Sequence, residues 1–384
     1  MFPFNFKLHT NMRFGEGISR NIVQYLTELG FKNIGIIIDK AIVNLEITNQ
    51  VIENLNNASI AFKIYENIVS EPNYDYLDEF KKNFINQRFQ ALIGIGGGST
   101  LDLSKGIATL LANPGPAIQY RGFPELQNKP LPVIAIPTTS GSGSEVTYNA
   151  VFTDAKQKKK LGINSEYNYP VMAIIDPLFT VSCPKSVTIS SGADALVHTL
   201  ESYVHKNHTP FSRILSKGAF QLLFNNLMLI LNNLDDINIR SNLALGAYLA
   251  GSALINAGPG PSGAFSYPLG AVYKVPHGYA GAVFLAHITR INVEKGYRDY
   301  AELFDLIDDV DRNLSFERKN IEFAIKIQEL MNTLEIPKSL SFYNLGPTDI
   351  EFLIDQYDLL KPVIDSNPMR ITKEDVQKMM NTLA

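Results

Sequence analysis

The sequence predicts an α/β N-terminal domain built on a parallel sheet, followed by an all-α C-terminal domain. With 384 residues, the chain exceeds the usual size of a single hydrophobic core. In the first half, runs that are apolar on both faces alternate with amphipathic helical segments, as in a parallel sheet covered on both sides. After Asp176-Pro177 the apolar residues recur mainly at helical spacing. We therefore expect domains at residues 1–187 and 188–384.

The elements of the first half follow from this periodicity and from the turns between the segments. Apolar residues recur at helical spacing from Ile18 to Leu29, and Gly30 is a good C-terminal cap. The apolar run Asn33–Ile38 predicts a buried strand that ends at Asp39. The other expected strands are Ala61–Tyr65, Ala91–Ile95 and Leu131–Ile136. One further helix is expected to end near Asn56, and two more are expected at Tyr74–Gln87 and Thr100–Leu111.

The second half is predicted to be helical, with turn-rich breaks at Gly258–Gly263 and Pro276–Gly278. At the other end of the chain, Met1–Arg13 alternates between apolar and polar residues, which predicts an edge strand that is available to pair with a second subunit. The expected helices are Ala193–Val204, Arg213–Asn232, Ile239–Ile255, Tyr297–Ile307, Ser315–Leu334, Thr348–Gln356 and Lys373–Leu383.

Composition excludes several classes of partner. A net charge of −4 argues against nucleic acid or an anionic membrane surface. No apolar run approaches the length of a membrane span, and the N-terminus lacks a signal-peptide pattern. The single cysteine, Cys183, excludes an intrachain disulfide and fits a reducing compartment. We expect a cytoplasmic protein.

A glycine-rich turn, Gly96-Gly97-Gly98-Ser99, joins the strand Ala91–Ile95 to a helix. Such a turn leaves backbone N–H groups exposed at a helix N-terminus, where they favour a phosphate. The usual dinucleotide pattern is incomplete, because Ser99 stands where a third glycine belongs. The alternative is a tight turn without a ligand.

Polar side chains also follow two other strands at their carboxyl ends, where parallel sheets bind ligands. Asp39 lies where a carboxylate accepts from ribose hydroxyls and repels a 2′-phosphate, or it is an ordinary helix N-cap. The loop Thr138–Glu145 is rich in hydroxyls that can donate to phosphate or ribose oxygens, although polar loops are common without ligands.

A possible metal pair lies on a predicted helix. Asp194 and His198 are four residues apart, so both side chains lie on one helix face, as a metal pair requires. A hydrogen bond between them is the alternative interpretation. His277, in a turn between Pro276 and Gly278, can converge on the same face.

These motifs together resemble the iron-containing (group III) alcohol dehydrogenase family over nearly the full length of the chain. The resemblance implies a Rossmann-like nucleotide-binding domain, an all-helical metal and substrate domain, and a cleft between them, the fold shared with dehydroquinate synthase. The matching stretches are Asp39, Gly96–Ser99 with Asp102 and Lys105, Pro137–Glu145, Asp176-Pro177, Gly192–Glu201 and Pro276-His277-Gly278.

The family's activity is the NAD(P)-dependent interconversion of alcohols with aldehydes or ketones, commonly in a homodimer. NAD(H) is expected because of Asp39. The cofactor-binding residues that the resemblance implies are Asp39, Gly96, Gly97, Gly98, Ser99, Asp102, Thr138, Thr139, Ser142, Asn149 and Lys160. For Lys160 there is an alternative interpretation, namely that it belongs to a solvated basic run with Lys158 and Lys159.

The chain departs from the family at the metal site. Asp194, His198 and His277 match three of the four ligands, but Gly263 stands in place of the remaining histidine, and Tyr267 replaces a second histidine in that stretch. Either the three residues and water hold Fe2+ or Zn2+, or the metal is weak or absent. Without metal, Tyr267 is the candidate proton donor, with His277 or Lys160 as further catalytic groups. His205 is expected on the surface.

Three functions stay open. The first is a dehydrogenase or aldehyde reductase, and the run Ser266–Leu269 hints at relatives that reduce phosphonoacetaldehyde, a small anionic aldehyde. The second is a metal-free lyase or cyclase of the dehydroquinate synthase type. The third is a catalytically impaired nucleotide-binding protein.

Overall fold

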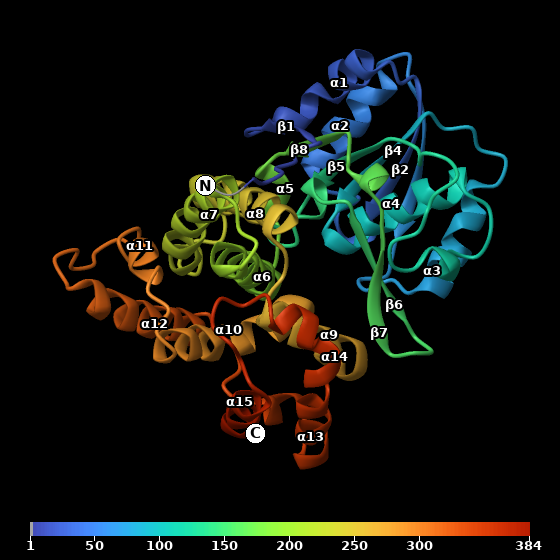
Figure 1. Ribbon diagram of the computed structural model, residues 1–384. Coiled ribbons are helices and arrows are strands. Elements are labelled where there is room, and N and C mark those ends of the chain that lie inside the picture. Colours follow the sequence, from blue (N-terminus) through green and yellow to red (C-terminus); the bar gives the residue numbers. More distant parts are fainter. Residues whose placement is uncertain (1–2) are drawn as a thin grey trace. The chain divides into compact units, whose positions relative to one another are not determined.

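The computed structural model describes residues 3–384 and confirms the predicted fold class: a parallel sheet with helices, then a helical half (Figure 1). The chain forms two compact units. One comprises Leu8–Pro184 and Asp235–Leu245, and the other comprises Lys185–Leu234, Gly246–Ala384 and the N-terminal segment up to Lys7. The domain boundary expected at residue 187 stays a prediction. None of the helices described is both long and apolar enough to span a membrane.

Six parallel strands form the sheet of the first unit in the order β1-β8-β5-β4-β2-β3. The first strand is shorter than the sequence predicts, because β1 begins only at Asn11, where its backbone pairs with β8. Residues 3–8 form neither helix nor strand, and Met1 and Phe2 lie outside the described residues. The strands are β1 Asn11–Phe14, β2 Asn33–Asp39, β3 Ala61–Asn67, β4 Ala91–Gly96, β5 Val133–Pro137 and β8 Met172–Ile175.

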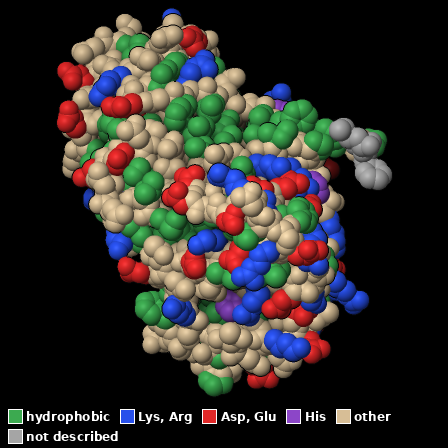
Figure 2. Space-filling view, turned by 90° about the vertical axis from the view of Figure 1, so that its left-hand side faces the viewer, with side chains coloured by type: hydrophobic (Ala, Val, Ile, Leu, Met, Phe, Trp, Pro, Cys, Tyr) green, Lys and Arg blue, Asp and Glu red, His purple; other side chains and the backbone are tan. Residues whose placement is uncertain are grey.

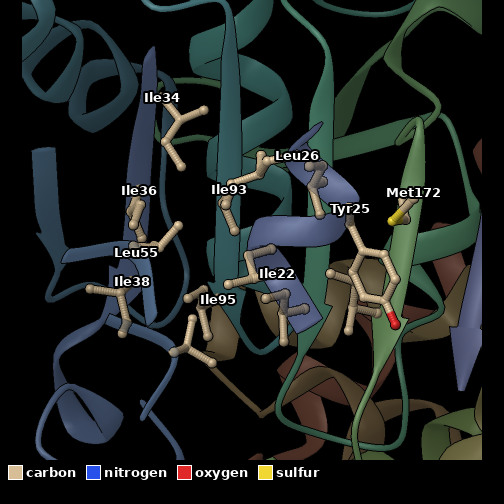
Figure 3. Packing of buried hydrophobic residues seen from close by; sticks show 14 of the residues in the cluster. Ile22, Tyr25, Leu26, Ile34, Ile36, Ile38, Leu55, Ile93, Ile95 and Met172 are labelled. Atoms are coloured by element: carbon tan, nitrogen blue, oxygen red, sulfur yellow. The ribbon is translucent and has the colours of Figure 1, made fainter. Parts of the chain in front are cut away.

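Helices cover both faces of this sheet, because successive strand residues point to opposite sides. Ile36 and Ile38 pack in a core with α1 (Ile22–Leu29) and α2 (Glu46–Asn56), part of which Figure 3 shows. Ile37, between them, joins a second core that includes residues of α3 and α4. On that second face lie α3 Tyr74–Lys81 and α4 Gly98–Ala112, and the short α5 Leu178–Val181 adds Phe179 to the first core.

A β-hairpin that the sequence did not predict packs on the second face. Strands β6 (Asn149–Asp154) and β7 (Lys159–Asn164) are antiparallel. Their inward side contributes Ala150, Phe152 and Ile163 to the core.

The second half contains helices that alternate with short loops (Figure 1). Two of them, α9 and α10, begin in the segments Gly258–Gly263 and Pro276–Gly278 that the sequence predicted as breaks. The helices are α6 Lys185–Val204, α7 Pro210–Leu229, α8 Ile237–Ala257, α9 Pro261–Tyr273, α10 His277–Glu294, α11 Tyr300–Phe304, α12 Phe316–Thr333, α13 Pro347–Asp355, α14 Tyr357–Ile364 and α15 Lys373–Leu383.

Candidate active site

The glycine turn forms the junction that the sequence predicts. β4 ends at Gly96, Gly97 is the extended N-cap, and α4 begins at Gly98. The N–H groups of Gly98 and Ser99 open the helix and therefore have no carbonyl partner within it. These two donors and the helix dipole favour an anion at this end of α4.

The hydroxyl-rich loop after β5 packs directly against the glycine turn. The N–H of Thr138 donates to the carbonyl of Gly96 at 3.0 Å. A Cβ on Gly98 would lie 2.6 Å from Oγ of Ser142, and one on Gly97 would lie 3.4 Å from Cγ2 of Thr139. The structure thus brings together the turn and the loop that the sequence assigned to one ligand.

Ser99 contributes to this turn with its backbone. Its hydroxyl donates to the carbonyl of Ser70. The neighbouring Thr100 accepts from Nδ2 of Asn67 at 2.9 Å. These bonds tie the start of α4 to the end of β3 and to the segment that follows it. Because its hydroxyl is engaged, Ser99 can offer a phosphate its backbone N–H.

Asp102 lies one turn further along α4, and its carboxylate binds groups of the chain itself. It accepts from Oγ of Ser144 at 2.5 Å and from the N–H of Val151 at 2.9 Å. Nζ of Lys105 lies 3.1 Å from Oδ1 of Asp102. Asp102 therefore holds the loop after β5 in place, a role that the sequence did not suggest.

Asp39 ends β2 and caps the short 3-10 helix that follows. Its Oδ1 accepts from the N–H of Ala41 at 2.9 Å. This is the capping role that the sequence left open, and it uses one of the two carboxylate oxygens. The half-buried side chain keeps its second oxygen for another donor.

The hairpin β6–β7 carries two more predicted residues. Lys160 is not on a solvated basic face, because its side chain is only 8% exposed and its Nζ lies 3.0 Å from Oε2 of Glu71. Nδ2 of Asn149 donates to Oδ1 of Asn164 across the hairpin at 3.0 Å. Both side chains are thus held in fixed positions.

In the helical unit, the structure brings Asp194, His198 and His277 together. Nε2 of His198 lies 3.6 Å from Oδ1 of Asp194, and Nε2 of His277 lies 3.8 Å from the same oxygen. One ligand atom of each residue lies within 4.8 Å of the other two. Asp194 and His198 are largely buried, whereas His277 is 35% exposed.

Gly278 explains how His277 reaches Asp194. His277 is the first residue of α10, and a Cβ on Gly278 would lie 1.9 Å from the carbonyl oxygen of Ser190 in α6. Only glycine permits this approach of the two helices. The Pro-His-Gly motif therefore has a packing reason as well as a chemical one.

Glu201 lies against Gly263, the position at which the resemblance implies a histidine ligand in other members of the family. Its buried carboxylate accepts from the N–H groups of Gly260 at 2.8 Å, Ser262 at 2.5 Å and Gly263 at 3.1 Å, which are the first turn of α9. A Cβ on Gly263 would lie 3.0 Å from Oε2 of Glu201. Burial raises the pKa of Glu201, and the three N–H donors and His198 oppose that rise.

Tyr267 lies on α9 beside His277. The two ring centroids are 5.7 Å apart, with an angle of 33° between the ring planes. The tyrosine is half-buried. A phenol next to the cluster can donate a proton or a hydrogen bond.

Comparison with protein families supports the first of the three functions left open. The family model described as iron-containing alcohol dehydrogenase matches residues 9–177, and the model of this family's C-terminal domain matches residues 188–384.

The chain belongs to the iron-containing alcohol dehydrogenase family.

Known members of this family are similar to the chain over its whole length. Long-chain-alcohol dehydrogenase 1 of Geobacillus thermodenitrificans (strain NG80-2) is 31% identical over 366 residues, which cover 94% of this chain and 92% of the relative. The crystal structure of a 1,3-propanediol oxidoreductase has a TM-score of 0.93 at 27% identity and covers 100% of both chains. That of sulfoacetaldehyde reductase from Bifidobacterium kashiwanohense with NAD+ has a TM-score of 0.90 at 26% identity and covers 100% of this chain and 99% of the other. The chain is accordingly an oxidoreductase of the alcohol dehydrogenase type.

The donor set of this alcohol dehydrogenase family member fits a divalent ion. One carboxylate and two imidazoles suit Fe2+ and Zn2+. The 3.6 and 3.8 Å separations exceed direct hydrogen bonds. The three ligand atoms therefore face one another across a gap that a cation can fill.

One histidine departs from expectation. His205, predicted on the surface, is only 5% exposed and follows the end of α6. Its Nδ1 accepts from the N–H of Asn207 at 3.0 Å. Burial lowers its pKa to about 4, and the charges of His208 and Lys206 add to this.

Proposed function

We propose that the protein interconverts a small alcohol and its aldehyde or ketone with NAD(H). In the reducing direction, NADH gives a hydride to the carbonyl carbon and the carbonyl oxygen takes up a proton, which yields the alcohol and NAD+. The observation that carries this proposal is the convergence of Asp194, His198 and His277 in a chain of this family.

The glycine turn and Asp39 support the choice of NAD(H). The N–H groups that open α4 suit a pyrophosphate. The Asp39 carboxylate favours ribose hydroxyls and opposes a 2′-phosphate. The sulfoacetaldehyde reductase at 26% identity holds NAD+ in its crystal structure.

Asp194, His198 and His277 would hold the divalent ion, Fe2+ or Zn2+. When bound, such an ion supplies a Lewis acid that polarises a carbonyl oxygen. The chain's own residues do the rest. Tyr267, beside His277, is the candidate donor of the proton that the product oxygen takes up. Lys160, oriented by Glu71, is a cofactor contact or a further catalytic group.

The substrate that we propose is a small anionic aldehyde, such as phosphonoacetaldehyde. The run Ser266-Tyr267-Pro268-Leu269 is the sequence feature that suggests it. A structural relative is named for the reduction of sulfoacetaldehyde, which also carries an anionic group next to a short aldehyde. A homodimer and a cytoplasmic location stay predictions from the resemblance and the composition.

The decisive experiment measures metal content together with NADH oxidation. Purified protein is assayed with phosphonoacetaldehyde, sulfoacetaldehyde and uncharged aldehydes of similar length. Each assay is repeated after the metal is removed with a chelator, and again after Fe2+ or Zn2+ is added back. We expect the anionic aldehydes to have the highest kcat/KM. Faster turnover of the uncharged aldehydes would contradict the substrate assignment.

Two variants separate the roles of metal and tyrosine. Asp194→Asn removes the shared carboxylate charge, and Tyr267→Phe removes the candidate donor. Tyr273→Phe is the matched control, because its hydroxyl, on the same helix, bonds to Asp349 at 3.0 Å and not to the cluster. We expect the first two to lose turnover and the control to keep it. NADH binding without turnover of any aldehyde would favour the impaired nucleotide-binding alternative.

A further inference from the structure

We propose that Ser266 is a positioning residue that holds His277 as the Nδ1–H tautomer and leaves the Nε2 lone pair facing Asp194. The inference concerns the same cluster as the proposed function and rests on it only for the metal affinity. The tautomer itself is a property of the protein without metal.

The hydrogen bonds of the Ser266 hydroxyl determine which nitrogen of His277 carries the hydrogen. Its Oγ lies 2.6 Å from the carbonyl oxygen of Gly263 and 3.2 Å from Nδ1 of His277. A hydroxyl has one hydrogen, and a carbonyl oxygen only accepts. At 2.6 Å the hydrogen lies between the two oxygens, because two acceptors at that distance would repel each other. Oγ can then only accept from His277, so Nδ1 carries the hydrogen.

The opposite nitrogen of His277 is thereby left unprotonated in the neutral ring. It lies 3.8 Å from Oδ1 of Asp194, and two acceptor atoms face each other across that gap. A cation between them would be attracted by both. With the other tautomer, an N–H would point at the carboxylate and one metal ligand would be lost.

The position of Ser266 is itself fixed. It is fully buried on α9, one turn after Gly263. The first turn of that helix is held by Glu201, which accepts from three backbone N–H groups including that of Gly263. The acceptor that orients the Ser266 hydroxyl therefore belongs to a turn that Glu201 holds in place.

His198 lacks a comparable support. Its Nδ1 is buried and has no hydrogen-bond partner among residues 3–384. With Gly263 in the place of a fourth ligand, each remaining ligand matters more for affinity. A side chain that fixes one imidazole is expected to have a correspondingly large effect.

The first test reads the tautomer directly. Nitrogen NMR of metal-free protein with labelled histidine, at a pH where the imidazole is neutral, should show Nδ1–H for His277. Ser266→Ala should lose this form, and Ser262→Ala should keep it. Ser262 is the matched control because its hydroxyl is buried on the same helix and has no partner among the described residues. An Nε2–H form in the native protein, or an unchanged tautomer in Ser266→Ala, would overturn the proposal.

The second test measures affinity for Co2+ by competition with a chelator. Ser266→Ala should weaken binding about 10- to 100-fold. Ser266→Thr keeps a hydroxyl and should recover most of this loss, whereas Ser262→Ala should match the native protein. Equal affinity in all variants would overturn the proposal.

The two tests also separate this inference from the proposed function. A native protein that shows the Nδ1–H tautomer but binds no Co2+ would contradict the metal site and support the role of Ser266. Thermal unfolding of each variant checks that it is folded. If Ser266→Ala fails to fold, the native spectrum and Ser266→Thr still decide the matter.

Discussion

Nζ of Lys105 lies 3.1 Å from Oδ1 of Asp102, and the lysine side chain is 0% exposed. The same ammonium donates to the carbonyl oxygens of Ser144 at 2.9 Å and Thr147 at 3.3 Å, and to that of Asn149. Burial lowers the pKa of Lys105, and the Asp102 charge opposes that change. The pair thus fastens the segment after β5, which contains the predicted cofactor loop, to helix α4.

Lys105→Met should destabilise the protein strongly. It leaves the Asp102 carboxylate buried without its cation, a change that costs about 3–5 kcal/mol. The double variant Asp102→Asn/Lys105→Met removes both charges and should recover a large part of this free energy. Urea unfolding measures the free energy of unfolding of the single and the double variant, and Lys159→Met, at an exposed lysine, is the control. A double variant no more stable than Lys105→Met would contradict the view that the unpaired charge is responsible.

Gly98→Ala should weaken NADH binding for a reason that can be separated from stability. The new Cβ would lie 2.6 Å from Oγ of Ser142, so the single variant should also lose about 1–3 kcal/mol of stability. The Cβ of Ser142 would also lie only 2.8 Å from the new Cβ, so Ser142→Gly in the same chain, which removes both atoms, should restore stability. If the pyrophosphate lies against the turn, the double variant should bind NADH about tenfold or more weakly than Ser142→Gly alone. Equal dissociation constants in those two proteins would contradict the assignment of this turn.

Asp39→Asn should shift the protein toward NADPH. Asparagine keeps the N-cap that Oδ1 provides to Ala41, but removes the charge that opposes a 2′-phosphate. We expect the ratio of NADPH to NADH affinity to rise about tenfold, which corresponds to about 1.4 kcal/mol. Fluorescence titrations with both cofactors measure the ratio. An unchanged ratio would mean that the carboxylate serves only as a cap.

Local chemistry explains which parts were predictable from the sequence. The β4–turn–α4 junction was predicted because an apolar strand, a glycine run and a helix follow one another directly. Strand β7 was missed because its first residues, Lys159 and Lys160, read as a solvated charge run. The burial of Lys160 depends on Glu71, which is distant in the sequence and carries no local signal.

Helices α9 and α10, which carry Tyr267 and His277, were also missed, and α9 shows a different reason. Most residues of α9 are buried on every side, so the helix shows no polar face by which it could be recognised. It also contains Pro268, and Pro261 at its start read as part of a break. The contacts of Glu201 and Ser266 depend on how α9 packs against α6 and α10, which the sequence alone does not reveal.

The distribution of charged side chains on the surface agrees with the overall composition of the sequence. On the face that Figure 2 shows, Lys and Arg side chains are interspersed with Asp and Glu, and neither sign forms a continuous field. This agrees with the small net charge of −4.

Mild acid should destabilise the protein through His205. Its pKa is about 4 in the folded state, below the 6.5 of an exposed histidine. Between these values the unfolded chain binds a proton that the folded chain does not, so stability is lost as pH falls from about 6.5 to about 4, by up to about 3 kcal/mol. His205→Asn retains an acceptor for the N–H of Asn207 and does not titrate. Urea unfolding at several pH values should show a smaller acid loss in this variant, and an identical loss would contradict the assignment.

Gly263→His tests whether the missing ligand can be restored. A Cβ at this position would lie 3.0 Å from Oε2 of Glu201, which three N–H donors hold in place, so the side chain fits only if Glu201 shifts. We therefore expect a loss of about 1–3 kcal/mol in stability together with tighter Zn2+ binding, because a fourth ligand adds both bonding and geometry. Gly263→Gln is the matched control, since it crowds Glu201 in the same way without an imidazole. Thermal unfolding and Zn2+ competition with a chelator measure the two effects. Equal Zn2+ affinity in the histidine and glutamine variants would mean that position 263 does not reach the cluster, and that Asp194, His198 and His277 must bind the ion without it.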